Sequence, residues 1–158
     1  MTAAEAALSL LGRVDGPVMV AEPGAWWGAR LRVAGLRTAD LAERAAAAAL
    51  VSFVGARTSP ELRRRTLEAL RGRLAVGAPL VLVDYNQPRQ WWRRPLATLL
   101  LVVRGMPPSR ARYPAARELD GAGFRVESLR LADGERVQVV LGRREVVNQP
   151  PLPLNSPA

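Results

Sequence analysis

Residues 59–84 read SPELRRRTLEALRGRLAVGAPLVLVD, and this stretch decides the fold. Residues 59–61 combine an N-cap serine, a first-turn proline and a first-turn acid, which together start a helix. The apolar stripe that we expect along this helix is Leu62, Leu67, Leu70 and Leu74. The run 79–83 that follows is continuously apolar, which is typical of a strand buried on both faces. The stretch therefore predicts a helix leading into a buried strand, which is the repeating unit of an α/β fold.

In the N-terminal third, predicted strands and helices also alternate, and turns that contain glycine and proline separate them. Two more buried strands are predicted, at 18–21 and 50–54. Helices are predicted at 2–11 and 25–36, and 38–49 is interpreted as a second helix or a short strand feeding one.

The C-terminal third predicts a short helix at 115–119 and then a hairpin, because Asp-Gly at 133–134 separates two apolar runs. We expect one α/β domain over 1–144, with an insert at 88–108 and a disordered proline-rich tail at 145–158. Its sheet should be mostly parallel, flanked by helices and closed by the C-terminal antiparallel hairpin.

The composition excludes several chemistries. The chain of 158 residues has no Cys and no His, and all 23 of its basic residues are Arg, so it has no Lys either. It therefore has no thiol nucleophile, imidazole base, Schiff-base lysine or His- or Cys-ligated metal, and we predict no metal site. Catalysis would depend on carboxylates, Tyr, Arg, backbone amides or a bound cofactor.

Four segments carry a resemblance to a known family: ALVSFVGA, ELRRRTLEALRGRLAVGAPLVLVD, PAARELDGAGFRVESLRL and ERVQVVLGRR. From residue 50 to residue 143 the chain resembles the C-terminal half of class I S-adenosylmethionine-dependent methyltransferases. The resemblance implies a Rossmann-like sheet, S-adenosyl-L-methionine as cofactor, and methyl transfer to a small, partly apolar substrate. Ligands of such sheets bind at the carboxyl ends of the strands.

The resemblance also implies a cofactor loop after the first strand. That family has an acid there, followed by Gly-x-Gly-x-Gly, and the segment EPGAWWG supplies Glu22, Gly24 and Gly28. Glycines in such a loop let the backbone approach the ligand closely. Trp26 stands in the place of the middle glycine.

The remaining site residues follow the same pattern. Asp40 corresponds to the acid that holds the ribose hydroxyls, and Val54 and Gly55 complete the expected cofactor contacts at the end of a later strand. Asp84 and Tyr85 are the candidate catalytic residues, because a carboxylate or a phenol there could accept or polarise the substrate proton.

Two departures from the family pattern keep a second hypothesis open. One is Trp26, and the other is the short segment 41–49, where the family has a further strand and helix. The alternative is a non-catalytic methyltransferase-like scaffold or binding protein that has lost the cofactor.

The insert allows three interpretations. Its segment RQWWRR at 89–94 and the apolar run 96–103 could cover a small-molecule pocket, touch a membrane surface through 89–103, or clamp nucleic acid. We favour a lid with Leu96, Leu99, Leu100 and Val103 on its inner face.

The charge and the N-terminus bear on partners and location. The net charge of +9 comes from arginines spread along the chain, so we do not favour nucleic acid as a partner. The first 12 residues have no basic start, and the run 96–103 is far short of the roughly 20 residues that span a bilayer. We therefore expect a cytoplasmic protein with a small-molecule substrate, and the oligomeric state stays open.

Overall fold

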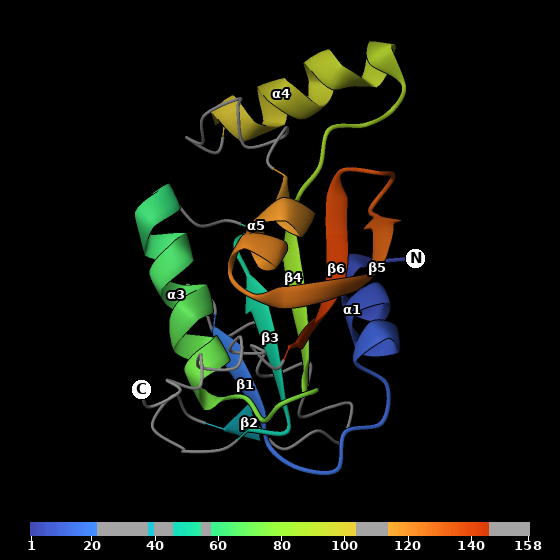
Figure 1. Ribbon diagram of the computed structural model, residues 1–158. Coiled ribbons are helices and arrows are strands. Elements are labelled where there is room, and N and C mark those ends of the chain that lie inside the picture. The colour runs from blue at the N-terminus through green and yellow to red at the C-terminus, as the bar shows by residue number, and fades with distance from the viewer. Residues whose placement is uncertain (22–37, 40–45, 55–57, 104–113, 146–158) are drawn as a thin grey trace, which may run out of the picture.

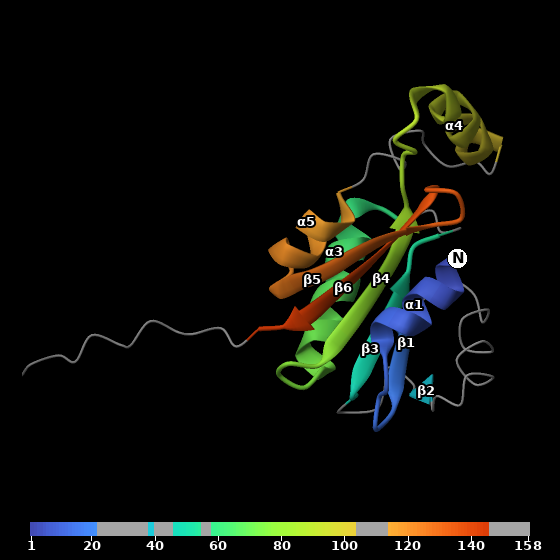
Figure 2. The same ribbon diagram turned by 90° about the vertical axis from the view of Figure 1, so that its right-hand side faces the viewer.

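The computed structural model describes residues 1–21, 38–39, 46–54, 58–103 and 114–145. These form a six-stranded sheet in the order β2-β1-β3-β4-β6-β5 with helices on both faces (Figures 1 and 2). The strands are β1 (Val18–Ala21), β2 (Thr38–Ala39), β3 (Ala48–Ser52), β4 (Pro79–Tyr85), β5 (Phe124–Ala132) and β6 (Val137–Arg144). The helices are α1 (Ala3–Leu11), α3 (Pro60–Arg73), the 3-10 turn η1 (Trp91–Arg93), α4 (Arg94–Val103) and α5 (Ala115–Gly121).

The sheet is mixed, so the prediction of a mostly parallel sheet is not confirmed. β1 pairs in parallel with β2 and β3, and β3 pairs in parallel with β4. β6 lies antiparallel between β4 and β5 and forms the longest ladders of the sheet. The hairpin is confirmed, but its second strand inserts between β4 and β5 instead of adding at the edge. Chain order along the hairpin does not reveal this insertion.

The core has two layers because the central strands are buried on both faces. Alternate residues of β3 and β4 face opposite sides, as the pleat of a strand requires. Leu50 and Val81 pack with the alanine-rich face of α1. Val51 and Leu82 pack instead with α3 and α5. Figure 2 shows α1 on the opposite side of the sheet from α3 and α5.

Helix α3 begins where the sequence predicts. The Ser59 side chain accepts a hydrogen bond of 3.1 Å from the amide of Leu62, and Pro60 opens the helix. The expected stripe is wrong at one position: the Leu62 side chain is 51% exposed, whereas Leu67, Leu70 and Leu74 are buried. Arg63 takes the inward place instead, and it is fully buried.

The hairpin turn follows the Asp-Gly signal. Asp133, Gly134 and Glu135 all have positive φ, at 51°, 66° and 68°. Such left-handed backbone is what makes Asp-Gly favourable in tight hairpins. The turn lies at the carboxyl end of β4, because Tyr85 pairs with Val137.

Several expectations fall outside the described residues. They are the predicted helix 25–36, residues 40–45 of the segment 38–49, the tail from 146 onward and the site residues Glu22, Gly24, Gly28, Asp40 and Gly55. Within the described parts of the chain, no helix has both the length and the apolar character to span a membrane.

Candidate functional site

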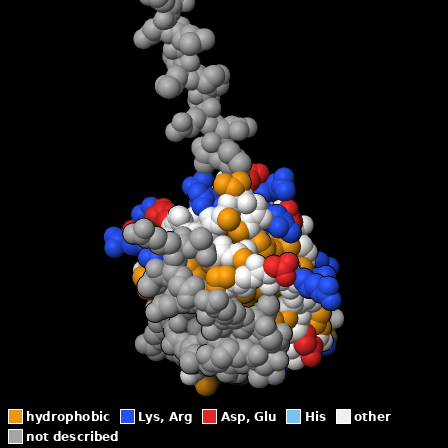
Figure 3. Space-filling view, turned by 90° about the horizontal axis from the view of Figure 1, so that it is seen from below, with side chains coloured by type: hydrophobic (Ala, Val, Ile, Leu, Met, Phe, Trp, Pro, Cys, Tyr) orange, Lys and Arg blue, Asp and Glu red, His pale blue; other side chains and the backbone are white. Residues whose placement is uncertain are grey.

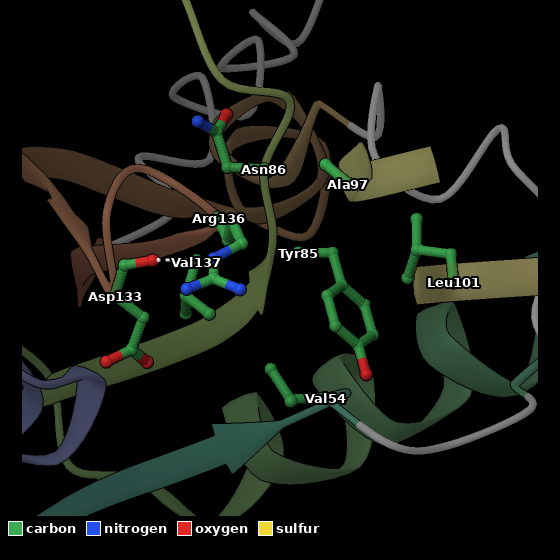
Figure 4. Close-up of a pocket in the computed structure, with 8 residues that line it drawn as sticks. All are labelled: Val54, Tyr85, Asn86, Ala97, Leu101, Asp133, Arg136 and Val137. Carbon is green, nitrogen blue, oxygen red and sulfur yellow. Dashed lines mark hydrogen bonds between the residues drawn. The ribbon is translucent and has the colours of Figure 1, made fainter. Parts of the chain in front are cut away.

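A cavity of about 350 Å³ lies at the carboxyl edge of the sheet, between the end of β4, helix α4 and the hairpin turn (Figure 4). Its lining residues are Val54, Tyr85, Asn86, Ala97, Leu101, Asp133, Arg136 and Val137. This is the edge where ligands of α/β sheets bind. Two residues of the predicted site, Val54 and Tyr85, line this cavity together.

Tyr85 forms the apolar wall of the cavity. It is the last residue of β4 and only 6% exposed, and it packs with Val54 and Leu101. Its ring points into the cavity, with the hydroxyl directed toward Val54 (Figure 4). The buried Gln138 side chain donates a hydrogen bond of 2.7 Å to the Tyr85 carbonyl oxygen, which fixes the backbone at this point.

Helix α4 covers the cavity, but the side of the helix that faces the cavity is not the one that the sequence predicted. Ala97 and Leu101, one turn apart, line the cavity and are buried. Leu99 and Val103 are 57% and 75% exposed, so the prediction that they form the inner face is wrong. Leu96 is 59% exposed and borders a second hollow with Ala97 and Arg136, and the Leu100 side chain lies outside the described residues. The helix is apolar on nearly every side, and its sequence alone therefore did not select the inward face.

The polar wall comes from the hairpin turn. The Arg136 guanidinium lies between Asp133 and Tyr85 in Figure 4, and its Nε donates to the Asp133 carbonyl oxygen at 3.0 Å. The Asn86 side-chain amide donates to the Glu135 carbonyl oxygen at 2.8 Å, and its backbone amide donates to the Arg136 carbonyl oxygen at 2.8 Å. Asn86 thereby holds the turn, with its arginine, against the end of β4.

Asp84 faces away from the cavity, because neighbouring residues of a strand point to opposite faces. Its carboxylate is fully buried and accepts a hydrogen bond of 2.7 Å from the Arg63 guanidinium and one of 2.8 Å from the Tyr85 amide. Arg63 also binds both carboxylate oxygens of Glu118, at 2.8 and 2.6 Å, and lies 3.9 Å from the centroid of the Phe53 ring. A catalytic role for Asp84 stays a prediction.

The surroundings of Arg63 favour its charged form. Burial by itself lowers the pKa of Arg63, but the hydrogen bonds to Glu118 and the charges of Asp84 and Glu118 outweigh it, and the net effect raises the pKa. Arg63 therefore stays protonated and ties α3, β4 and α5 together directly behind Tyr85.

Comparison with solved structures places this fold among methyltransferases. The chain superimposes on human N-acetylserotonin methyltransferase, solved in complex with SAM, with a TM-score of 0.61 at 12% identity over 90% of this chain. The values for the pyocyanin biosynthetic protein PhzM are a TM-score of 0.57 at 18% identity over 80% of the chain. The N-methyltransferase NodS from Bradyrhizobium japonicum WM9 superimposes with a TM-score of 0.58 at 11% identity over 90% of this chain. No protein-family model and no curated protein matches the sequence.

The comparisons support the methyltransferase fold and nothing finer. This chain spans 42% of PhzM and 52% of the human enzyme, but 94% of NodS. Proteins of quite different length therefore superimpose on 80–90% of this chain.

Of the predicted cofactor-binding residues, the described parts of the chain include Val54 alone, which lines this cavity. Ala21 pairs with Val51 in parallel register, so β1 and β3 end at the same edge. A ligand bound where the chain leaves β1 would border Val54 and the cavity. No cluster of three acidic side chains within the described ranges could hold a metal ion.

Sequence reasoning missed three residues of this region: Arg63, Arg136 and Gln138. For Arg63 a signal was present, because 63, 67, 70 and 74 have the four-three-four spacing of one helix face, which 62 breaks. For Arg136 and Gln138 the decisive fact is the insertion of β6 beside β4. That pairing is long-range and leaves no local pattern.

Proposed function

We propose that this protein transfers a methyl group from S-adenosyl-L-methionine to a small, partly apolar acceptor held in the Tyr85 cavity. The observation that carries the proposal is the cavity itself, which opens at the carboxyl edge of a sheet with the methyltransferase architecture. The similar fold of human N-acetylserotonin methyltransferase, solved in complex with SAM, supports this reaction class.

The cofactor would lie over the ends of β1 and β3. By the resemblance, the loop that contains Glu22, Gly24 and Gly28 would contact the cofactor, and Asp40 would bind the cofactor's ribose. Val54 and Gly55 would border it on the side of the cavity. When bound, the cofactor supplies a methyl group activated by its sulfonium charge, so the chain needs no metal or imidazole for the transfer.

The cavity residues would orient the acceptor and exclude water. Val54, Ala97 and Leu101 offer an apolar surface, which desolvates the acceptor next to the methyl group. The Tyr85 hydroxyl would hydrogen-bond the acceptor's nucleophilic atom. Arg136 would hold a polar or anionic end of the same molecule.

Asp84 acts in this proposal as a positioning residue. Its carboxylate binds the Tyr85 amide and Arg63, and so it sets where the end of β4 and the Tyr85 ring lie. Asp84 itself is not one of the residues that line the cavity.

Calorimetric titration tests the proposal. S-adenosylhomocysteine, the demethylated cofactor, should bind to the full chain below millimolar concentration. The variant Asp40→Ala should weaken that binding about tenfold, which is the loss expected for a charge-assisted hydrogen bond. Glu68→Ala, at an exposed position of α3, is the matched control and should bind like the unchanged protein.

A non-catalytic scaffold is the second candidate, and Trp26 in the cofactor loop favours it. The same titration separates the two candidates. A folded protein that shows no heat of binding at millimolar cofactor would exclude the enzyme and leave the scaffold.

A further inference from the structure

The apolar surface of the described chain is concentrated in one segment. Six of the ten exposed large hydrophobic side chains fall within residues 91–103. We call this set the α4 outer face: Trp91, Trp92, Leu96, Leu99, Val102 and Val103, which are between 51% and 76% exposed. Monomeric proteins rarely leave such a continuous apolar area without an interaction partner.

The geometry of the α4 outer face suits a flat partner. Trp92, Leu96, Leu99 and Val103 follow one another at helical spacing and therefore form one stripe. The opposite side of the same helix, with Ala97 and Leu101, is buried against the cavity. Helix α4 projects beyond the carboxyl edge of the sheet in both views, so its outer face is not enclosed by the sheet (Figures 1 and 2).

The charged side chains within this segment are all positive, and the acid beside it is Glu135, whose carboxylate accepts a hydrogen bond of 3.0 Å from the Arg89 amide. Residues 89–103 contain three arginines and no acid. Arg93 stacks 4.7 Å from the centroid of the Trp92 ring, and Arg94 donates to the backbone carbonyls of Pro88 and Arg89. None of the three guanidinium groups forms an ion pair with a carboxylate of the described chain.

We propose that the α4 outer face docks on the surface of an anionic lipid bilayer. A helix that exposes leucines and tryptophans on one side, with arginines beside them, can lie in the interface plane with that apolar side between the headgroups. Tryptophan favours this depth because its ring is apolar and its N–H stays hydrated. The arginines attract the anionic headgroups, and their aliphatic stems add apolar contact.

Charge complementarity favours a bilayer over a second copy of this chain. In a dimer through the α4 outer face with parallel helices, Arg89, Arg93 and Arg94 of one copy would lie close to the same arginines of the other. With antiparallel helices they would face the end of the segment that leads into Arg104. Like charges held that close repel, and no acid in the segment offsets them. An anionic bilayer supplies the missing negative charge.

Co-sedimentation with vesicles tests the proposal. The full chain should bind vesicles of 70% phosphatidylcholine and 30% phosphatidylglycerol at least tenfold more tightly than pure phosphatidylcholine vesicles. Raising the salt from 50 to 300 mM should weaken this binding several-fold, because screening reduces the headgroup attraction. Tryptophan emission should shift to shorter wavelength on binding, as Trp91 and Trp92 leave water.

Two matched variants separate this face from the overall positive charge. Leu96→Ser with Leu99→Ser should lower the affinity for anionic vesicles at least tenfold. Val76→Ser with Leu129→Ser removes two similarly exposed hydrophobic side chains elsewhere and should leave binding unchanged. If the first variant does not fold, Arg89→Gln with Arg93→Gln replaces it and should weaken binding roughly fivefold per arginine.

Three results would overturn the proposal. One is equal binding by the two serine variants, because the general charge of the molecule then explains binding. Another is the absence of binding to either vesicle. The third is a concentration-dependent dimer in ultracentrifugation that the Leu96→Ser, Leu99→Ser variant abolishes while vesicles do not bind, because the outer face then belongs to a second copy. None of these results bears on cofactor binding, which the calorimetric titration measures separately.

Discussion

Arg63 links three elements of the molecule through its side chain. It is fully buried on α3 and reaches Asp84 on β4 and Glu118 on α5. A buried charge is tolerated only when paired charges and hydrogen bonds replace its hydration, and two carboxylates and an aromatic ring surround this one. The desolvation of Arg63 and the interactions that offset it all lie within this cluster. A single substitution there should therefore have a large effect on stability.

Replacing Arg63 with Met should destabilise the protein strongly. The change leaves Asp84 buried without its cation, and breaking such a pair costs about 3–5 kcal/mol in the free energy of unfolding. Urea denaturation followed by circular dichroism measures the effect. Arg64→Met is the control, because its pairs with Glu61 and Glu68 are exposed to solvent and contribute little to stability. Similar losses in the two variants would contradict the assigned role of the buried cluster.

At the scale of elements, helix α3 depends on its N-cap. Ser59→Ala removes the hydrogen bond from the Leu62 amide and should cost about 1 kcal/mol in the free energy of unfolding. Asn at the same position accepts an equivalent hydrogen bond, so Ser59→Asn should retain nearly full stability. Thermal denaturation of the two variants compares them directly, and an equal loss in both would show that the cap hydrogen bond is not the cause.

Helix α4 offers a second prediction at this scale, since its two sides have opposite environments. Leu101→Ala empties a buried position beside Tyr85 and should cost about 2–4 kcal/mol. Leu99→Ala changes an exposed position of the same helix and should stay within about 0.5 kcal/mol. Denaturant unfolding of both variants measures the difference. The reverse order would mean that Leu99 faces inward.

At the scale of the whole molecule, the sheet brings the ends of its parallel strands and the Tyr85 cavity to one edge. The parallel strands β1, β3 and β4 end together, and the turn after β5 returns to the same place. The charge is not gathered in the same way: on the face that Figure 3 shows, Arg side chains alternate with acidic ones.

Ligand-linked stabilisation of the folded chain tests this arrangement. S-adenosylhomocysteine at 100 times its dissociation constant should add about 2.7 kcal/mol to the free energy of unfolding. For a domain of this size, that corresponds to a rise of about 5–10 °C in Tm. Differential scanning fluorimetry measures the shift, and adenosine monophosphate serves as the control ligand. An unchanged Tm at millimolar ligand would contradict cofactor binding.

The sequence by itself determined the elements whose signals are local. The Ser59-Pro60-Glu61 start of α3, the apolar run of β4 and the Asp-Gly turn of the hairpin are all confirmed. Capping, continuous burial and positive φ depend on neighbouring residues, so they can be read from a short stretch. The position of Tyr85 in a cavity at the carboxyl edge follows from β4 in the same way.

Only the tertiary structure decided the features that depend on distant partners. The insertion of β6 between β4 and β5 makes the sheet mixed and brings Arg136 and Asn86 together. The burial of Arg63 requires Glu118, 55 residues away in the chain. Helix α4 is apolar on both sides, so only contact with Tyr85 selects Ala97 and Leu101 as its inner face and leaves the outer face exposed. In each case the free energy comes from long-range contacts, which no local pattern encodes.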